Sequence, residues 1–361
     1  MEDQLNLSHE FSGHIYIFHA FDIGDDINLD KVATLRTIRT IPISLPKYFK
    51  NYHTPLAIEL PHPNQSARCA SVQLHKFGAV SLMYRIPFHS TLEDLRQEFY
   101  EIYDHYQEQS VADVKLVYKK IEPYINQPQF FQTRASYNIL QVNPQPSQMD
   151  LTQFKQQFGN IVASSLRFET ESLSEYQKNE ILDSAIGYYR GNLIIVDSDT
   201  TFIYDDDYSD LLSFVEFTNL QQLELQYFDR LLDKRLNQIY EGGGIQKVSM
   251  LSYLPFLDNI ADPVATLGKL KVDISVITER LEGSIKLAGE PYYTEFYHVL
   301  IKKLDIQAWQ ESIERKLEII KDVQLVYQHK TDVIRENVLE ILIIILIATE
   351  LVLGILEYIR Q

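Results

Sequence analysis

Aspartate residues gather at two places in the sequence, and such groups are candidates for binding a divalent cation. The first group is Asp22, Asp25 and Asp26, and the second is Asp197, Asp199, Asp205, Asp206 and Asp207. A hard cation needs several oxygen ligands at close range, and neither group has the spacing or the final Glu of a calcium-binding loop. Because Asp is also common in turns, we interpret both groups as solvated turns and predict no metal site.

Histidine, cysteine and glycine patterns indicate no familiar catalytic centre. The histidines are scattered without an HExxH motif or a Cys/His cluster, and His14 and His19, five residues apart, should lie on opposite faces of a strand. The single cysteine, Cys69, is expected to be small and partly buried, not nucleophilic. Glycines 242–244 lack the Gly-Lys-Ser/Thr ending of a phosphate loop. We predict a protein without catalytic activity and without a cofactor, while a triad assembled in space from distant residues stays open.

The most distinctive segment is apolar. Val338–Leu356 holds fourteen Ile, Leu or Val in nineteen residues, interrupted by Glu340 and Glu350. On an insertion scale the aliphatic residues contribute roughly −4 to −8 kcal/mol, against about +3 kcal/mol for a central carboxylate. We predict a single transmembrane helix; the alternative is a core helix buried in an oligomer. Glu350 either contacts another anchor helix or partner, or snorkels to the interface.

A heptad pattern leads into this segment. Its positions follow alternating spacings of four and three, which is typical of a coiled coil: Ile313, Leu317, Ile320, Gln324, Tyr327, Thr331, Ile334, Val338 and Ile341. A shorter apolar pattern in residues 267–281 can cover only part of this seam, and a break at 289–291 separates the two helices. We therefore predict a homo-oligomer in which Gln324 and Thr331 set the register.

The residues before the stalk predict an α+β head. The predicted domains are a head over 1–241, a linker over 242–263, a helical stalk over 264–337 and the anchor over 338–356. Within the head we expect a helix capped near Asn28 or Asp30, a hairpin that turns near Lys76–Gly78, and a helix that begins at Thr91. Further strands are expected over Ala135–Val142 and Val162–Phe168, and a long helix from Tyr208. A duplicated strand-pair and helix unit is one interpretation; a single mixed sheet is slightly favoured.

Charge and the first residues of the chain bear on partners and location. The net charge is −17, and most of the acidic excess lies before residue 266. Binding to a phosphate backbone needs clustered Lys and Arg, so no direct nucleic-acid partner is expected. The opening MEDQLNLSHEF resembles neither a signal nor a transit peptide. We expect a single-pass membrane protein with its head in the cytoplasm, in contact with membrane lipid.

Four segments resemble the Required-for-Meiotic-Nuclear-Division family, a domain of unknown function. They are Lys316–Ile320 with its KLEII motif, the Ile/Leu-rich stretch Leu339–Leu353 with Glu350 as internal acid, the helical stretch Glu216–Leu236 and, more weakly, the HKFGAVSLMY strand. The resemblance implies a membrane-associated, self-assembling protein and carries no catalytic motif. Mitochondrial members support translation by the organelle's ribosomes. The chain resembles a bacterial member, in which the head would face the inner side of the cytoplasmic membrane.

Two functions follow. The first is a membrane-anchored, self-associating scaffold or assembly protein whose protein partner the sequence does not identify. The alternative is an enzyme or nucleotide-binding protein with an unrecognised site in the head. A converging set of polar side chains in a pocket would favour the alternative, and dispersed polar groups would favour the scaffold.

Overall fold

The chain forms two compact units. The computed structural model describes residues 9–50, 53–61, 68–130, 134–144, 151–187, 191–241, 263–287 and 289–360. Unit 1 comprises Met1–Tyr227 and Glu279–Trp309, and unit 2 comprises Phe228–Thr278 and Gln310–Gln361. The predicted linker lies almost entirely outside the described residues, and the predicted domain boundaries stay a prediction.

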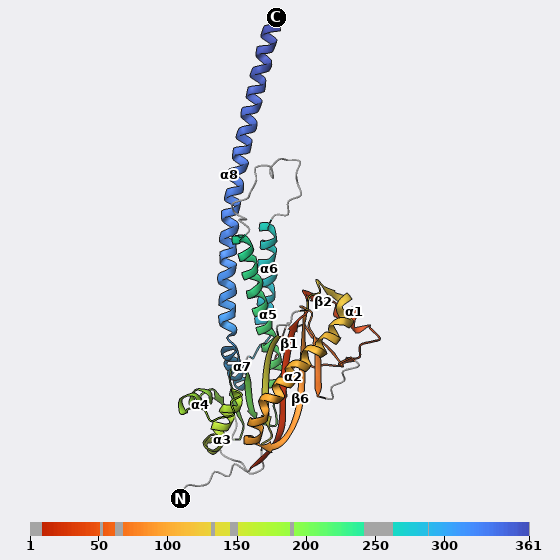
Figure 1. Ribbon diagram of the computed structural model, residues 1–361, viewed down its shortest axis with the longest axis vertical. Helices are drawn as coiled ribbons and strands as arrows, with labels where there is room; N and C mark the ends of the chain where they lie inside the picture. Colours follow the sequence, from red (N-terminus) through yellow and green to blue (C-terminus); the bar gives the residue numbers. More distant parts are fainter. Residues whose placement is uncertain are drawn as a thin grey trace. The chain divides into compact units, whose positions relative to one another are not determined.

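One mixed sheet of nine strands organises unit 1, in the order β3-β4-β5-β6-β1-β8-β11-β10-β9 (Figure 1). Its neighbours are antiparallel except β8 and β11, which are parallel. A separate pair joins β2 to β7. The strands are β1 (Glu10–Asp22), β2 (Asp26–Ile27), β3 (Thr40–Ile41), β4 (Leu56–Ile58), β5 (Cys69–Leu74), β6 (Ala79–Thr91), β7 (Ile125–Asn126), β8 (Arg134–Val142), β9 (Ala185–Ile186), β10 (Leu193–Val196) and β11 (Thr200–Tyr204).

The helices complete the α+β fold that the sequence predicts. They are α1 (Leu29–Ala33), α2 (Leu92–Ile121), the short 3₁₀ helix η1 (Glu122–Tyr124), α3 (Leu151–Leu166), α4 (Glu175–Leu182), α5 (Ser209–Glu241), α6 (Pro263–Glu282), α7 (Pro291–Lys303) and α8 (Ile306–Arg360). The α+β class is therefore confirmed. The two halves of the sheet pair differently, since β1 is antiparallel to β6 whereas β8 is parallel to β11. This favours one mixed sheet over a duplicated unit.

The two faces of the sheet are covered by different helices, and alternation along the strands decides which residues each face presents. Val72, Leu74 and Leu82 join the large apolar core on the side of α2 and α3. Residues of intervening parity, such as Gln73 and Ser81, point to the opposite face, where α5 lies. That face is built from small side chains at its centre: Ala20, Ala79 and Ala135 pack with Leu220 and Leu223 of α5.

Local signals predicted the β5–β6 hairpin and the start of α2 correctly. Gly78 has a φ of +93°, and an added Cβ would lie 1.6 Å from the carbonyl oxygen of Gly24, so the turn requires glycine at this position. Thr91 caps α2: its hydroxyl accepts a hydrogen bond from the backbone N–H of Asp94. Asn28 caps α1 in the same way.

The strand predicted over Val162–Phe168 is wrong. Residues 162–166 belong to α3, and 167 and 168 form the turn that follows it. The segment's Val, Leu and Phe residues suggested a strand, but Phe154, Phe158 and Ile161 continue a helical apolar face with Val162. Packing of that face against the sheet and α2 stabilises the helix despite the β-branched residue.

The described part of unit 2 is helical. It holds the C-terminal part of α5, most of α6 and α8 from residue 310. The inner positions of these segments are buried: Phe228, Leu232, Leu236, Ile274, Ile313, Leu317 and Ile320. Lys316 of α8 pairs with Asp229 and Asp233 of α5, with both Nζ–Oδ1 distances 2.7 Å. The two helices are thus held side by side at this level.

Candidate functional sites: a carboxyl cavity and an exposed apolar helix

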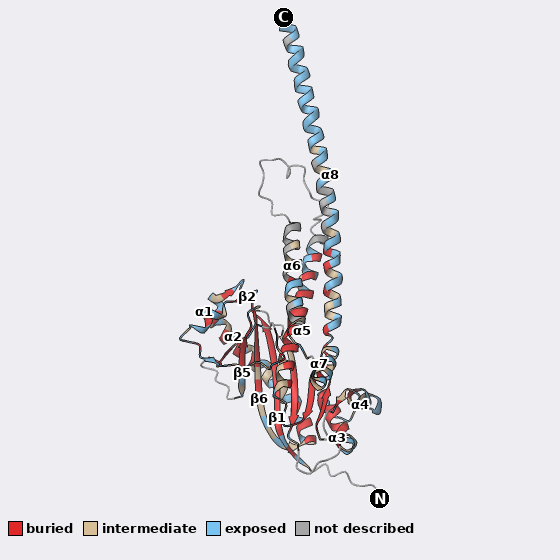
Figure 2. Cartoon of the chain, turned by 180° about the vertical axis from the view of Figure 1, so that it is seen from behind, coloured by how far each residue is buried: buried red, intermediate tan, exposed pale blue. Residues whose placement is uncertain are grey.

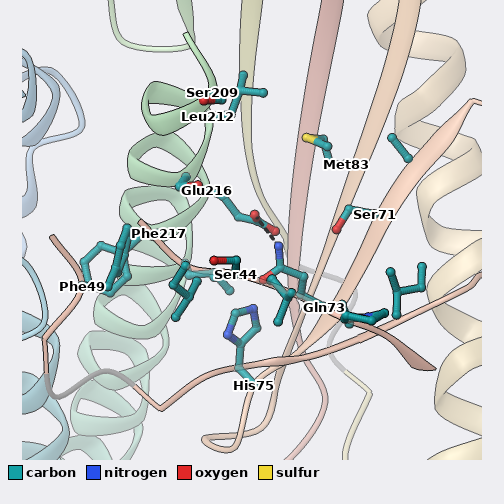
Figure 3. A pocket seen from close by; sticks show the side chains of 18 residues that line it. Ser44, Phe49, Ser71, Gln73, His75, Met83, Ser209, Leu212, Glu216 and Phe217 are labelled. Carbon is teal, nitrogen blue, oxygen red and sulfur yellow. Dashed lines mark hydrogen bonds between the residues drawn. The ribbon is translucent and has the colours of Figure 1, made fainter. Parts of the chain in front are cut away.

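A cavity of about 260 Å³ lies in unit 1 between α5, strands β4 to β6 and the loop that follows β3 (Figure 3). Most of its described lining residues are apolar or carry hydroxyl groups. The lining residues that bear on its chemistry are Ser44, Phe49, Ser71, Gln73, His75, Met83, Ser213, Glu216 and Phe217.

Secondary-structure periodicity brings Glu216 to this cavity. Ser209, Leu212, Ser213, Glu216 and Leu220 recur at spacings of three and four along α5, so they share the helix face that covers the sheet. The facing strands present Gln73 and Ser81 there because every second strand residue points to this side. The wall of the cavity is therefore formed by one face of α5 and one face of the strands. These elements lie more than a hundred residues apart in the sequence.

Glu216 is the charged residue of the site, and both of its carboxylate oxygens accept hydrogen bonds. The Ser81 hydroxyl donates to Oε1 at 2.6 Å, and the Gln73 side-chain amide donates to Oε2 at 2.7 Å. Burial raises the pKa of Glu216 from 4.5 to about 7, although both hydrogen bonds favour the ionised form. Near neutral pH this carboxyl group is therefore divided between its protonated and ionised forms.

His75, on the turn after β5, is the other titratable side chain among the described lining residues. Burial lowers its pKa to about 3, so the imidazole is neutral at physiological pH. The ring stacks on Phe77 with centroids 5.3 Å apart. His75 therefore contributes polarity and shape to the wall, without positive charge.

Cys69 and Asp113 belong to a second polar cluster, inside the core under α2. Tyr84 donates a hydrogen bond to Asp113 Oδ2 at 2.7 Å, and Gln109 donates to Oδ1 at 2.8 Å. Burial and the Asp113 carboxylate raise the pKa of the Cys69 thiol to about 12. A thiol with this pKa is protonated at neutral pH and is a poor nucleophile, which agrees with the expectation from the sequence.

The prediction that both aspartate groups form solvated turns is wrong for three of their members, which are buried: Asp22, Asp197 and Asp205. The other members are exposed, as predicted: Asp25, Asp26, Asp199, Asp206 and Asp207. Asp197 is buried at the β10–β11 turn and pairs with Arg167 and with Lys303 of α7, the latter at 3.1 Å. Asp22 Oδ1 accepts the backbone N–H of Gly24. Among the described residues, no group of three or more His, Cys, Asp or Glu side chains is arranged to hold a metal ion.

His14 and His19 lie on opposite faces of β1, as their spacing predicts. The His19 ring meets Tyr84 on the α2 side, with centroids 6.1 Å apart, whereas the His14 ring lies beside Tyr16. Burial lowers the pKa of His19 to about 3. Neither histidine lines the carboxyl cavity.

The second candidate site is the C-terminal part of α8. The segment Asp332–Arg360, 29 residues long, is long and apolar enough to cross a membrane, which is weak evidence for a span by itself. Every described residue from Leu339 to Arg360 is exposed (Figure 2). A core helix of a soluble protein would bury one face, whereas the described residues from Leu339 to Arg360 are exposed on every side of the helix within this single chain.

The predicted seam residues have two different environments. Ile313, Leu317 and Ile320 are buried within unit 2 of the single chain, so they are already covered. Ile334 is half-buried and Glu350 is exposed. The side chains of Gln324, Tyr327 and Thr331 lie outside the described residues, and their role in an oligomer stays a prediction.

Comparison with known proteins places the sheet of unit 1 in a family. Residues 12–210 match the family model described as "Uncharacterized protein MJ0711, N-terminal domain". The chain belongs to this family. The match runs from β1 to the first residues of α5, so the matched residues include the strands that line the carboxyl cavity, while Glu216 and α6 to α8 lie beyond them.

One relative of this chain also matches over only part of its length. The uncharacterized protein MJ0711 of Methanocaldococcus jannaschii is 29% identical over 203 residues, which are 54% of this chain and 59% of the relative. The chain thus matches less than two thirds of that protein's length. No solved structure matches the chain. The expectation of a domain of unknown function is met by the MJ0711 family.

Glu216 was not recognised as a site residue from the sequence. It appears there only as the first residue of Glu216–Leu236, a stretch that resembles a known family, and a single carboxylate between Val215 and Phe217 forms no catalytic motif. The signal that could have identified it is its helical face: positions 209, 212, 213 and 220 are mostly small or apolar, so a Glu among them faces the sheet. Its partners Gln73 and Ser81 become evident only in the folded chain.

Proposed function

We propose that this member of the MJ0711 family is a membrane-anchored, self-associating protein without catalytic activity, with its head in the cytoplasm. The observation that carries the proposal is the exposure of an apolar helix on all sides. Leu346 and Leu353, for example, are 67% and 66% exposed. Contiguous apolar surface of this extent is rare in soluble monomers and marks an interaction with a membrane or a partner.

The dimensions of the helix fit a bilayer. Twenty-nine residues at 1.5 Å each give about 44 Å, compared with about 30 Å for the hydrocarbon core. The helix can therefore cross the core and still place its ends in the headgroup regions. Within the apolar stretch Val338–Leu356, Glu340 is the third residue and lies near one end. Glu350 lies further inside, where a carboxyl group needs a partner, a proton or local water.

Alkaline carbonate extraction of membranes tests the anchor. The full chain should stay in the pellet, and a chain that ends at residue 331 should appear in the supernatant, because attachment by surface charge is reversible whereas an inserted helix is not. Release of the full chain by carbonate would contradict the anchor. A truncated chain that stays in the pellet would show that another part binds the membrane.

Self-association is proposed for the part of α8 beyond Ile320, since this part of the seam finds no full cover within its own unit among the described residues. A cysteine at the half-buried position 334, in a chain with Cys69→Ser, should be crosslinked between subunits by a short bismaleimide. A cysteine at the exposed position 336, about 200° around the helix, is the matched control and should crosslink much less. Equal crosslinking at both positions, or at neither, would contradict a specific seam.

The resemblance to the Required-for-Meiotic-Nuclear-Division family supports one finer proposal, that the protein assists an assembly at the cytoplasmic face of a bacterial membrane. The motif residues Lys316–Ile320 lie on α8, where Lys316 forms the ion pairs with α5. Organellar members act on translation, so ribosomal components are the partners to look for. Their recovery with the detergent-solubilised full chain, but not with a chain lacking residues 332–361, would support this role.

The alternative, an enzyme or nucleotide-binding protein with a site in the head, has one observation in its favour. Gln73 and Glu216 meet in the cavity wall, and Ser81, which lies outside the lining, donates a hydrogen bond to Glu216. None of the described lining residues is Lys or Arg, however, and phosphate groups are usually held by such cations or by a phosphate loop. The cavity therefore favours a ligand other than a nucleotide.

A further inference from the structure

We propose that the carboxyl cavity of unit 1 binds a small organic cation: an ammonium compound with an apolar body about the size of one aromatic ring, whose charge pairs with Glu216. The described lining residues all belong to unit 1. The proposal therefore goes beyond membrane anchoring and does not depend on it.

The size of the cavity sets the size of the ligand. An apolar cavity of about 150 Å³ holds benzene in a well-studied protein, and drug-sized ligands occupy pockets of about 300 Å³ or more. The cavity here, at about 260 Å³, lies between these values. One ring with a short chain fits this volume, and a nucleotide does not.

The charge of the wall sets the sign of the ligand. Glu216 is the acidic residue among the described lining residues, and it lies on α5. The loop 41–49 and strands β4 to β6 contribute no charged side chain to the described wall, and the nearby His75 is neutral. An anionic ligand would meet a carboxylate without a compensating cation, whereas a cation would pair with it in a site of low dielectric.

Hydrogen bonds fix the position of the Glu216 carboxylate and leave room for an ion pair with a ligand. Ser81 and Gln73 each donate to one oxygen of Glu216, and an ionised carboxylate has about four acceptor positions. Two positions are thus left for an ammonium group. Phe49, Met83 and Phe217 line the cavity and supply apolar surface for the body of the ligand.

The affinity should depend on pH in a defined way. Only the ionised form of Glu216 attracts a cation, and burial raises its pKa to about 7. The ionised fraction increases from about one tenth at pH 6 to about nine tenths at pH 8, so the affinity for an ammonium compound should increase about tenfold. An alkylamine, with a pKa near that of lysine at about 10.4, stays protonated throughout.

Three probes share a phenyl ring on a two-carbon chain and differ in the charge of the terminal group. They are the cation phenethylamine, the neutral 2-phenylethanol and the anion phenylacetate. Isothermal titration of the full chain in detergent, with empty micelles as blank, should show binding of phenethylamine that tightens about tenfold from pH 6 to pH 8. 2-Phenylethanol should bind more weakly at pH 8 and show no pH dependence of this kind. Phenylacetate should not bind measurably.

Two isosteric variants test whether the pH-dependent binding of phenethylamine depends on Glu216. Glu216→Gln should abolish the pH dependence and reduce the affinity for phenethylamine to that for 2-phenylethanol. Glu224→Gln is the matched control, because Glu224 is buried on the same helix but does not line the cavity, and it should behave like the unmodified chain. If Glu216→Gln does not fold, the pH profiles of the three probes on the unmodified chain decide.

Any of three results would overturn the proposal: no phenethylamine binding at millimolar concentration, equal affinity for the amine and the alcohol at pH 8, or the same amine affinity with Glu216→Gln as without it. Because binding is measured on the solubilised chain, failure here leaves the membrane anchor untouched. A protein released by carbonate could still bind the amine, so the two proposals fail separately.

Discussion

Burial gives the carboxyl group of Glu216 a property that carboxyl groups in water lack: it holds its proton until the pH is close to neutral. The cause is the loss of solvation in the cavity wall, which outweighs the hydrogen bonds from Ser81 and Gln73. Such perturbed groups gather at functional sites more often than elsewhere. At the scale of the residue, Glu216 is therefore the group that connects fold and function in unit 1.

The same pKa predicts how stability changes with pH. Glu216 loses its proton near pH 4.5 in the unfolded chain and near pH 7 in the folded chain, so between these values the folded state binds more protons. Its contribution to the free energy of unfolding is full below about pH 4.5 and decreases by about 3 kcal/mol as the pH rises to about 7. Glu216→Gln should remove this part of the decrease.

Urea unfolding of unit 1 in the full chain, at pH 5 and at pH 8, measures the effect. The unmodified chain should lose more stability between the two pH values than the Glu216→Gln variant. Glu101→Gln, at an exposed position on α2, is the surface control and should follow the unmodified chain. Parallel changes for the unmodified chain and Glu216→Gln would show that Glu216 is ionised in both states over this range.

At the scale of the element, the sequence predicted features that depend on one short segment. It did not predict features that depend on contacts between distant segments. The turn at Gly78 and the cap at Thr91 were predicted because a few adjacent residues determine them. The C-terminal half of α3 was missed because tertiary packing outweighs the strand preference of Val162. The cavity was also missed, since its wall joins residues from 41 to 220 that nothing in the local sequence connects.

The contact between α5 and α8 provides a test at this scale. Burial alone would lower the pKa of Lys316, but hydrogen bonds with Asp229 and Asp233 raise it overall. Lys316→Met would leave the mostly buried Asp229 without its cation and should destabilise unit 2 by about 3 kcal/mol, at the low end for a buried pair. The low end applies because Asp233 is 52% exposed.

Hydrogen exchange of the amides in α5 residues 228–238 and α8 residues 310–320 would show this loss as an acceleration of about a hundredfold. The neighbouring pair Arg315–Glu311 is the matched control, since both side chains are 67% exposed and 3.8 Å apart. Arg315→Met should change the exchange by less than about fivefold, as is usual for a surface pair. Equal effects of the two substitutions would contradict a special role for Lys316.

At the scale of the whole molecule, the chain combines a family domain with a segment suited to a membrane. The MJ0711 family match ends at residue 210, and the apolar segment of α8 begins over a hundred residues later. The sequence predicted this segment because apolar content over nineteen residues is a strong signal that needs no tertiary context. We propose that residues 338–356 lie within a bilayer.

Spin labelling in liposomes tests this claim most directly. With Cys69→Ser as background, the two chains carry Leu346→Cys in the middle of the segment or Asp322→Cys before it, both at exposed positions. In the predicted result, the label at 346 is relaxed by oxygen, which concentrates in the hydrocarbon, and is shielded from a water-soluble nickel chelate; the label at 322 shows the reverse. A label at 346 that the nickel chelate reaches as readily as the label at 322 would contradict the account.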